Sequence, residues 1–218
     1  MRRHPQNHNL HIHHDHTYQG LPVMHEKGPF IREHLQRLYD TMQRALDEHP
    51  RTFAFRVELK FPSSGMLPSY AFTNEVISRF IESFKAKIEH NRSMAKERSR
   101  YAHSCTVRYV WVREIASSDR PHYHLVIFLN KDAYSVLGHF RSEGGNVFNR
   151  LEEAWASALR LPRDAVVGLV HIPRNPGYYI TRDDERSQAE FFHRASYLCK
   201  AATKEFGDRQ HSFGASRG

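Results

Sequence analysis

Hydrophobic positions along the first half of the chain follow two different periods. Residues 31–48 repeat apolar side chains every three or four positions, which predicts a helix. Apolar and polar side chains alternate over residues 52–62, which predicts a strand with one apolar and one charged face. A second helix is expected after a cap at Thr73 or Asn74, with an apolar stripe as far as Ile88. We expect this helix to dissolve in the basic stretch NRSMAKERSR.

The second half of the chain predicts a hairpin followed by alternating elements. The segments CTVRYVWVRE and HYHLVIFLN are expected to be two strands joined across IASSDRP. After them come an expected helix over 149–160, a strand over 165–173, a loop over 174–188, a last helix over about 187–206, and an irregular tail. The order α, β-α-β-β-α-β, α predicts an α+β fold. We expect a split β-α-β (RRM/ferredoxin-like) antiparallel sheet, with helices on one face and the other face free.

The N-terminal residues have a different character. They contain the histidine-rich run HNLHIHHDH and no apolar period. We interpret residues 1–29 as a flexible extension that becomes ordered only by packing on the domain, and residues 30–218 as a single domain. A metal-binding tail is the alternative interpretation.

Charge and composition narrow the class of partner. The chain of 218 residues has a formal net charge of +8 and a pI of about 9.6, which favours a polyanion such as nucleic acid. Two cysteines give no disulfide framework. No stretch reaches the roughly 18 apolar residues of a membrane span, and no signal-peptide pattern opens the chain. We therefore expect a cytoplasmic protein.

The strand RPHYHLVIFLN carries candidate metal ligands. His122 and His124 are two positions apart, so their imidazoles project from one face and can share a divalent ion. A pair of surface histidines at a strand end is the alternative. If the predicted hairpin forms, Glu114 lies near them and is our first choice of third ligand, ahead of Glu58 and of Asp119 in the turn. Two imidazoles and one carboxylate suit Mn²⁺ or Mg²⁺.

The last predicted helix carries a candidate nucleophile. At about 100° per residue, its apolar stripe lies nearly opposite a polar side that presents Tyr197, Lys200 and Lys204. A solvated basic stripe is the alternative interpretation. A phenol with an ordinary pKa of about 10 needs activation at neutral pH, and a dication together with Lys200 favours the phenolate. We expect the helix over 31–48 to pack against residues 191–206.

Together these motifs resemble a known superfamily. The HYH strand, the upstream Glu114 and the downstream Y-x-x-K are similar to the HUH endonucleases. The segments YVWVREIASSDRPHYHLVIFLNKDAY, EAWASAL, GLVHIP and RASYLCKAATKEFGDRQHSFGASRG are similar to the inovirus (filamentous phage) gene-two type replication initiators of phages and prophages. The resemblance covers residues 30–218. The first strand departs from it, because AFRVELKF lacks the F-T-x-N-like motif of some viral initiators.

The resemblance implies a rolling-circle initiator that nicks and rejoins single-stranded DNA. His122, His124 and Glu114 would bind the metal, and Tyr197 would attack the scissile phosphate, leaving a 5′-phosphotyrosine and a free 3′-hydroxyl. The DNA would be a replication origin, with helicase and polymerase supplied by the host. Candidate DNA contacts are Arg108, Arg194, Lys204, Tyr178 and Tyr179. For Tyr178 and Tyr179, the alternative to stacking on bases is a role as second nucleophile. The alternatives are a non-catalytic RRM-like binding protein and a related HUH transposase or relaxase.

Overall fold

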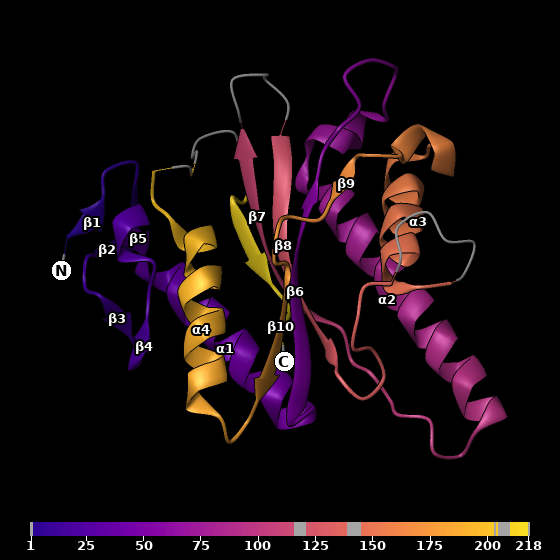
Figure 1. Cartoon of the computed structure of the whole chain (residues 1–218). Coiled ribbons are helices and arrows are strands. Elements are labelled where there is room, and N and C mark those ends of the chain that lie inside the picture. The colour runs from indigo at the N-terminus through magenta and orange to yellow at the C-terminus, as the bar shows by residue number, and fades with distance from the viewer. Residues whose placement is uncertain (1, 116–120, 139–144, 203, 205–209, 218) are drawn as a thin grey trace.

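An antiparallel sheet lies at the centre of the computed structural model, which describes residues 2–115, 121–138, 145–202, 204 and 210–217 (Figure 1). Its strands are β6 (Arg51–Leu59), β7 (Arg108–Ile115), β8 (Pro121–Asn130), β9 (Val170–His171), β10 (Gly177–Thr181) and β11 (Phe213–Ala215). They run in the order β10-β6-β8-β7-β11, and β9 pairs with the end of β6. The protein is therefore α+β, in agreement with the sequence.

The alternation along β6 separates the two faces of the sheet. Phe55 and Val57 are fully buried and belong to a first hydrophobic core, whereas Ala54 belongs to a second core on the opposite face. In the register with β8, Phe55 lies opposite Ile127 and Glu58 lies opposite His124. The two faces predicted for this strand thus correspond to the two faces of the sheet, each of which has its own hydrophobic core.

The first face is covered by α2 (Asn74–Arg98) and α3 (Val147–Leu159). Thr73 caps α2 by accepting a hydrogen bond from the backbone N–H of Glu75, and Asn146 caps α3 in the same way. The helix predicted to dissolve in the basic stretch instead continues through it, because Lys, Arg, Glu and Ala are good helix formers even without an apolar stripe.

The sequence predicts a free second face, and this prediction is wrong. The second face is covered by α1 (Arg32–Glu48) and α4 (Glu185–Ala195). Figure 1 shows these two helices on the side of the sheet opposite α2 and α3. Leu38 and Met42 of α1 pack with Phe191 and Phe192 of α4 in the second core. The predicted packing of the first helix against residues near 191–206 is therefore confirmed. Two amphipathic helices that must bury their apolar sides account for the covered face.

The N-terminal residues also pack on this second side. They form a small sheet of β1 (Arg3–His4), β2 (Asn7–His13) and β5 (Phe30–Ile31), a pair of strands β3 (Thr17–Tyr18) and β4 (Leu21–Pro22), and a 3-10 turn η1 (His25–Lys27). Tyr18, Val23 and Met24 are buried in the second core, and the backbone N–H of Met24 donates to Ser196 Oγ at 2.9 Å. These contacts hold the segment against the domain.

The helix predicted over 187–206 is shorter than expected. It begins at Glu185 and ends at Ala195, and residues Ser196–Cys199 form a 3-10 turn, η4. The Ser196 hydroxyl donates to the carbonyl of His193, and Lys200 forms a β-bridge with Phe30. These contacts draw the chain out of the helix, so Tyr197 does not lie on the predicted helix.

Three predictions about strands and loops were also wrong. Residues 163–166 form a 3-10 turn, η3, and Gly168 has a positive φ of +80°, so the strand predicted over 165–173 is reduced to β9. The predicted loop over 174–188 contains β10, and the predicted irregular tail contains β11.

A further 3-10 turn, η2 (Ser69–Phe72), precedes α2. No helix in the described part of the chain is long and apolar enough to span a membrane.

Candidate metal centre

The pairing of β7 with β8 brings the three predicted ligands together. Glu114 lies directly opposite His122 in the register, and His124 is the next residue on the same face. Glu114 Oε2 is 3.7 Å from His122 Nε2 and 3.4 Å from His124 Nε2. One ligand atom from each residue lies within 4.8 Å of the others. The expected convergence of two imidazoles and one carboxylate is therefore present.

The centre is placed at the boundary between core and solvent. Farther along β8, Val126 and Phe128 occupy the same face and are buried in the second core. Glu114 is buried, whereas both imidazoles are half-buried. The rings are 4.8 Å apart and nearly perpendicular, at 78°. A small ion or a phosphate oxygen can thus approach from solvent while the carboxylate is held by the fold.

Glu58, the second-choice ligand, lies behind His124 and outside this group of three. Its Oε1 is 3.3 Å from His124 Nδ1, and its Oε2 is 3.0 Å from Nδ1 of His171 on β9. If Nδ1 donates to Glu58, Nε2 is the nitrogen of His124 that faces Glu114 and is placed to ligate a metal ion. His171 is not among the residues predicted from the sequence, because its contact with Glu58 depends on the pairing of β9 with β6. Asp119 lies outside the described residues.

Burial and charge shift the protonation of these groups in different directions. Burial and the neighbouring His124 lower the pKa of His122, which keeps this imidazole neutral and able to bind a cation. For His124, burial lowers the pKa, but the carboxylates of Glu114 and Glu58 outweigh that effect and raise it. The hydrogen bond from His124 lowers the pKa of Glu58 from 4.5 to about 2. Glu58 is therefore ionised at neutral pH, and its negative charge lies next to His124 and His171.

Lys204 joins the centre from the C-terminal segment. Its Nζ is 3.1 Å from Glu114 Oε1, and its side chain is fully buried. Burial lowers the pKa of Lys204, opposed by the attraction of Glu114. We had predicted this lysine on an exposed helix face as a DNA contact. The helix ends before it, and the chain instead turns Lys204 inward to neutralise Glu114.

The structure does not join Tyr197 to the metal centre in the same direct way. Tyr197 is half-buried in η4, and the Lys200 ammonium lies 3.7 Å from the centre of its ring. Among the described residues, no hydrogen bond or ion pair connects Tyr197 with His122, His124 or Glu114. Tyr197 and the candidate metal centre are connected through the backbone, because Lys204, which pairs with Glu114, is on the segment that follows Tyr197.

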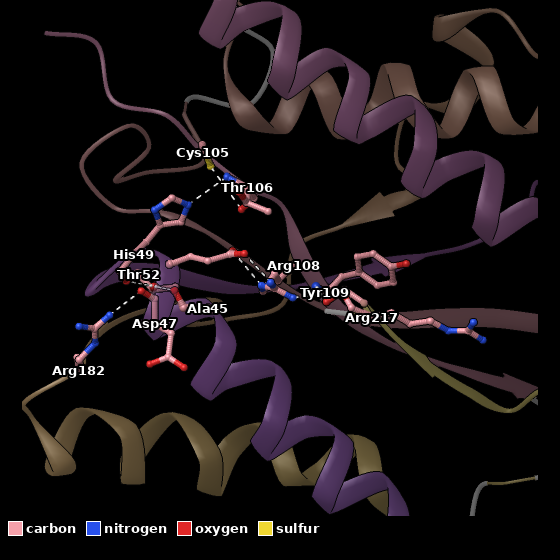
Figure 2. A network of polar contacts seen from close by, with 12 residues as sticks. Ala45, Asp47, His49, Thr52, Cys105, Thr106, Arg108, Tyr109, Arg182 and Arg217 are labelled. Carbon is pink, nitrogen blue, oxygen red and sulfur yellow. Dashed lines mark hydrogen bonds and ion pairs between the residues drawn. The ribbon is translucent and has the colours of Figure 1, made fainter.

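Arg108 lies at the other end of β7 from Glu114 and has a structural role there. Its guanidinium is buried, pairs with Glu48 of α1, and donates to the carbonyl of Arg217. Figure 2 shows this network, in which Arg182 also donates to the carbonyl of Asp47. Arg108 therefore holds α1 against the sheet. Its positive charge is paired with Glu48, which argues against the predicted contact with DNA.

The remaining candidate DNA contacts are distributed along α4 and β10. Arg194 is exposed near the end of α4. Tyr178 packs edge-on against Phe191, whereas Tyr179 is half exposed and donates its hydroxyl hydrogen to the carbonyl of Ser135 at 2.6 Å. Of these residues, Arg194 and Tyr179 are the more accessible to a ligand.

Comparison with known proteins assigns the chain to a family. The sequence model of the YagK/YfjJ C-terminal domain matches residues 13–216. The chain belongs to the YagK/YfjJ C-terminal domain family. The match includes Glu114, His122, His124 and Lys204, so the whole candidate metal centre lies within this domain.

Two relatives of this YagK/YfjJ-family domain come from Escherichia coli strain K12. The uncharacterized protein YfjJ is 32% identical over 203 residues, which cover 88% of this chain and 98% of YfjJ. The uncharacterized protein YagK is 32% identical over 209 residues, which cover 92% of this chain and 98% of YagK. No solved structure gives a significant match. The comparisons thus establish the family, and the chemistry must be argued from the site.

Proposed function

We propose that this YagK/YfjJ-family protein is a rolling-circle replication initiator that nicks and rejoins single-stranded DNA through a covalent 5′-phosphotyrosine. The observation that carries the proposal is the convergence of Glu114, His122 and His124 across one hairpin. The strand order β10-β6-β8-β7 and the succession β6-α2-β7-β8-α3-β10 also fit the split β-α-β arrangement expected for an HUH nuclease domain.

The ligand set fits the proposed cofactor. Two imidazole nitrogens and one ionised carboxylate are suitable ligands for Mn²⁺ or Mg²⁺, and the half-buried histidines leave room for phosphate oxygens. A bound dication would draw charge from the scissile phosphate and so favour its displacement. Glu58 would hold His124 in the ligating orientation, and Lys204 would hold Glu114.

Tyr197 is the proposed nucleophile. Its phenolic oxygen would form the new bond to phosphorus, the bond to the 3′-oxygen would break, and the proton would pass to the released 3′-hydroxyl. The reverse reaction would reseal the strand. The Lys200 ammonium over the tyrosine ring places a positive charge where a phosphate group would approach.

The partners follow from this chemistry and from the charge. A net charge of +8 favours binding to a polyanion. We propose that the DNA is the single-stranded form of a replication origin and that the free 3′-hydroxyl primes a host polymerase. Host helicase would open the duplex, and the reaction would take place in the bacterial cytoplasm.

The non-catalytic RRM-like alternative is less well supported. Such proteins stack bases on aromatic side chains of an open sheet. Here α1 and α4 cover the second face over most of its length, and Phe128 in its centre is buried. No observation in the described residues favours a transposase or relaxase over an initiator, and the identity of the cleaved DNA would separate them.

Adduct formation tests the proposed function. A pool of randomised single-stranded oligonucleotides is labelled at either end and incubated with protein and Mn²⁺. The 3′-end label should move with the protein on a denaturing gel, whereas the 5′-end label should be released. Tyr197→Phe should abolish the adduct, and Tyr101→Phe, at an exposed tyrosine with no proposed role, serves as the matched control. An adduct that persists in Tyr197→Phe would show that another residue is the nucleophile.

The same assay tests the metal centre. His122→Ala should slow cleavage about 100-fold or more, because charge on the phosphate is then poorly stabilised. Affinity for the DNA should change little, since it comes from lysine and arginine. Cleavage by His122→Ala at the wild-type rate would remove the basis of the proposal.

A further inference from the structure

A cavity of about 820 Å³ lies between the N-terminal sheet and the residues that follow η4. His4 lines it from β1, Arg2 lines it from the residue before that strand, and Ile12 lines it from β2. The opposite wall is formed by Ala201, Ala202 and Lys204. The volume lies within the range of about 300–1,000 Å³ that is usual for small-ligand sites.

The position of the cavity connects it with both parts of the proposed active site. The backbone N–H of Ala201 donates to the carbonyl of Pro29 at 2.9 Å, which fixes one wall against the N-terminal segment. Lys204 lines the cavity and also pairs with Glu114 of the metal centre. Tyr197 precedes this wall on the same short segment. The cavity is thus adjacent to the stretch of chain that links nucleophile and metal centre.

The lining combines two kinds of surface. Arg2 contributes an exposed guanidinium, His4 and His14 contribute imidazoles, and the described lining residues include no aspartate or glutamate. The ammonium of Lys204, which also belongs to the wall, is already paired with Glu114. Pro5, Ile12 and Pro29 provide apolar surface. A ligand with an anionic group and a flat, weakly polar ring system matches this combination, and a nucleotide has both.

We propose that this cavity binds a nucleotide of the single-stranded DNA substrate, next to the phosphate that is cut. This inference rests on the proposed function. A nucleotide bound in the cavity would hold the adjacent scissile phosphate in position at the metal centre. The N-terminal residues would then form part of the substrate site.

Filling the cavity tests the proposal directly. Ala202 lies on its wall and is exposed, so Ala202→Trp adds bulk without disturbing a core. We expect a labelled single-stranded oligonucleotide to bind this variant about tenfold more weakly, as judged by fluorescence anisotropy in metal-free buffer. Val167→Trp is the matched control, because Val167 is exposed far from the cavity lining. Equal affinity of wild type and Ala202→Trp would overturn the proposal.

The charge of the cavity provides a second test that does not depend on bulk. Arg2→Ala should reduce the slope of log affinity against log salt by about 0.7, the value for one lost contact with a single-strand phosphate. Arg98→Ala removes the same charge at the end of α2, on the other side of the sheet (Figure 1), and should leave the slope unchanged. Identical slopes for the two variants would contradict the assignment.

The outcomes separate the cavity from the proposed chemistry. If wild type forms the covalent adduct and Ala202→Trp binds DNA normally, the cavity assignment fails and the proposed function stands. If Ala202→Trp loses affinity but wild type never forms an adduct, the cavity assignment stands and the chemistry fails. A deoxynucleoside monophosphate that binds as tightly as the oligonucleotide would identify a free-nucleotide site and overturn the assignment to DNA.

Discussion

Glu58 shows how a residue outside the group of ligands can determine what that group does. It contacts Nδ1 of His124 with one carboxylate oxygen and Nδ1 of His171 with the other. This arrangement fixes which nitrogen of His124 is directed at Glu114. Carboxylates that hold a ligating histidine in this way commonly contribute a factor of about 10–100 in metal affinity.

We predict that Glu58→Ala lowers the affinity for Mn²⁺ about 10–100-fold, because His124 then loses its preferred tautomer and orientation. Isothermal titration calorimetry measures this change without any DNA. His171→Ala is the matched control, since it leaves the contact between Glu58 and His124 in place. Equal losses in the two variants would show that Glu58 acts only through the packing of β9.

At the scale of single residues, the sequence predicted which residues form the candidate metal centre better than it predicted what the residues around it do. Glu114, His122 and His124 follow from two-residue alternation and one hairpin, which are local properties. The roles of Lys204 and His171 depend on tertiary packing, because one follows the unexpected end of α4 and the other lies on a strand of two residues. No local pattern indicates either of these roles.

Among the elements, α4 determines where the C-terminal segment begins its path to the metal centre. Its first turn is capped by Asp184, whose side chain accepts hydrogen bonds from the backbone N–H groups of Arg186 and Ser187. Its buried side places Phe191 and Phe192 in the second core. A stable first turn therefore supports both the packing and the direction of the helix.

Asp184→Ala should lower the free energy of unfolding by about 1 kcal/mol, because two backbone donors lose their partner. Urea denaturation of the full chain measures the difference. Asp183→Ala removes an exposed carboxylate from the adjacent position, outside the cap, and should change stability by less than about 0.5 kcal/mol. Similar losses in both variants would mean that charge, and not capping, is responsible.

The elements that the sequence predicted well are the long ones with a clear period. The apolar stripe of α1 and the alternation of β6 are each sustained over many residues. The missed strands β10 and β11 are short, and each gains its hydrogen bonds from a partner far away in the sequence. Gly214 of β11 also lies so close to Trp111 that a Cβ would be 2.4 Å from the indole, a fit that no local pattern reveals.

At the scale of the whole molecule, two hydrophobic cores enclose the sheet, and its two ends have different roles. The end at Arg108 is closed by ion pairs and carbonyl contacts (Figure 2). The end at Glu114 carries the metal centre and lies beside the cavity. The interior also contains imidazoles whose pKa is lowered by burial, among them His4 and His34.

This burial predicts that the protein loses stability in mild acid. Burial lowers the pKa of His34 well below 6.5, helped by the charges of Lys204, Arg37 and His4. In the unfolded chain His34 binds a proton near pH 6.5, whereas in the folded chain it stays neutral to a lower pH. The free energy of unfolding therefore falls as the pH drops below 6.5. His124 acts in the opposite sense, because its raised pKa contributes stability at low pH that is lost as the pH rises.

His34→Phe should flatten the loss of stability between pH 7.5 and pH 5, as measured by urea denaturation at each pH. The new ring can keep the stacking on Phe213, and it removes a buried Nδ1 that has no hydrogen-bond partner among the described residues. His8→Phe changes an exposed imidazole and should retain the wild-type slope. An unchanged slope in His34→Phe would show that other groups cause the acid sensitivity.

The ion pair between Lys204 and Glu114 has a consequence for how the protein is made. A buried carboxylate without a counter-charge is costly, and here the polypeptide supplies that counter-charge itself. The fold around these residues therefore needs no ion to balance this charge, unlike small domains that fold only around their metal. If the candidate centre binds an ion, a newly synthesised molecule can fold first and bind the ion afterwards.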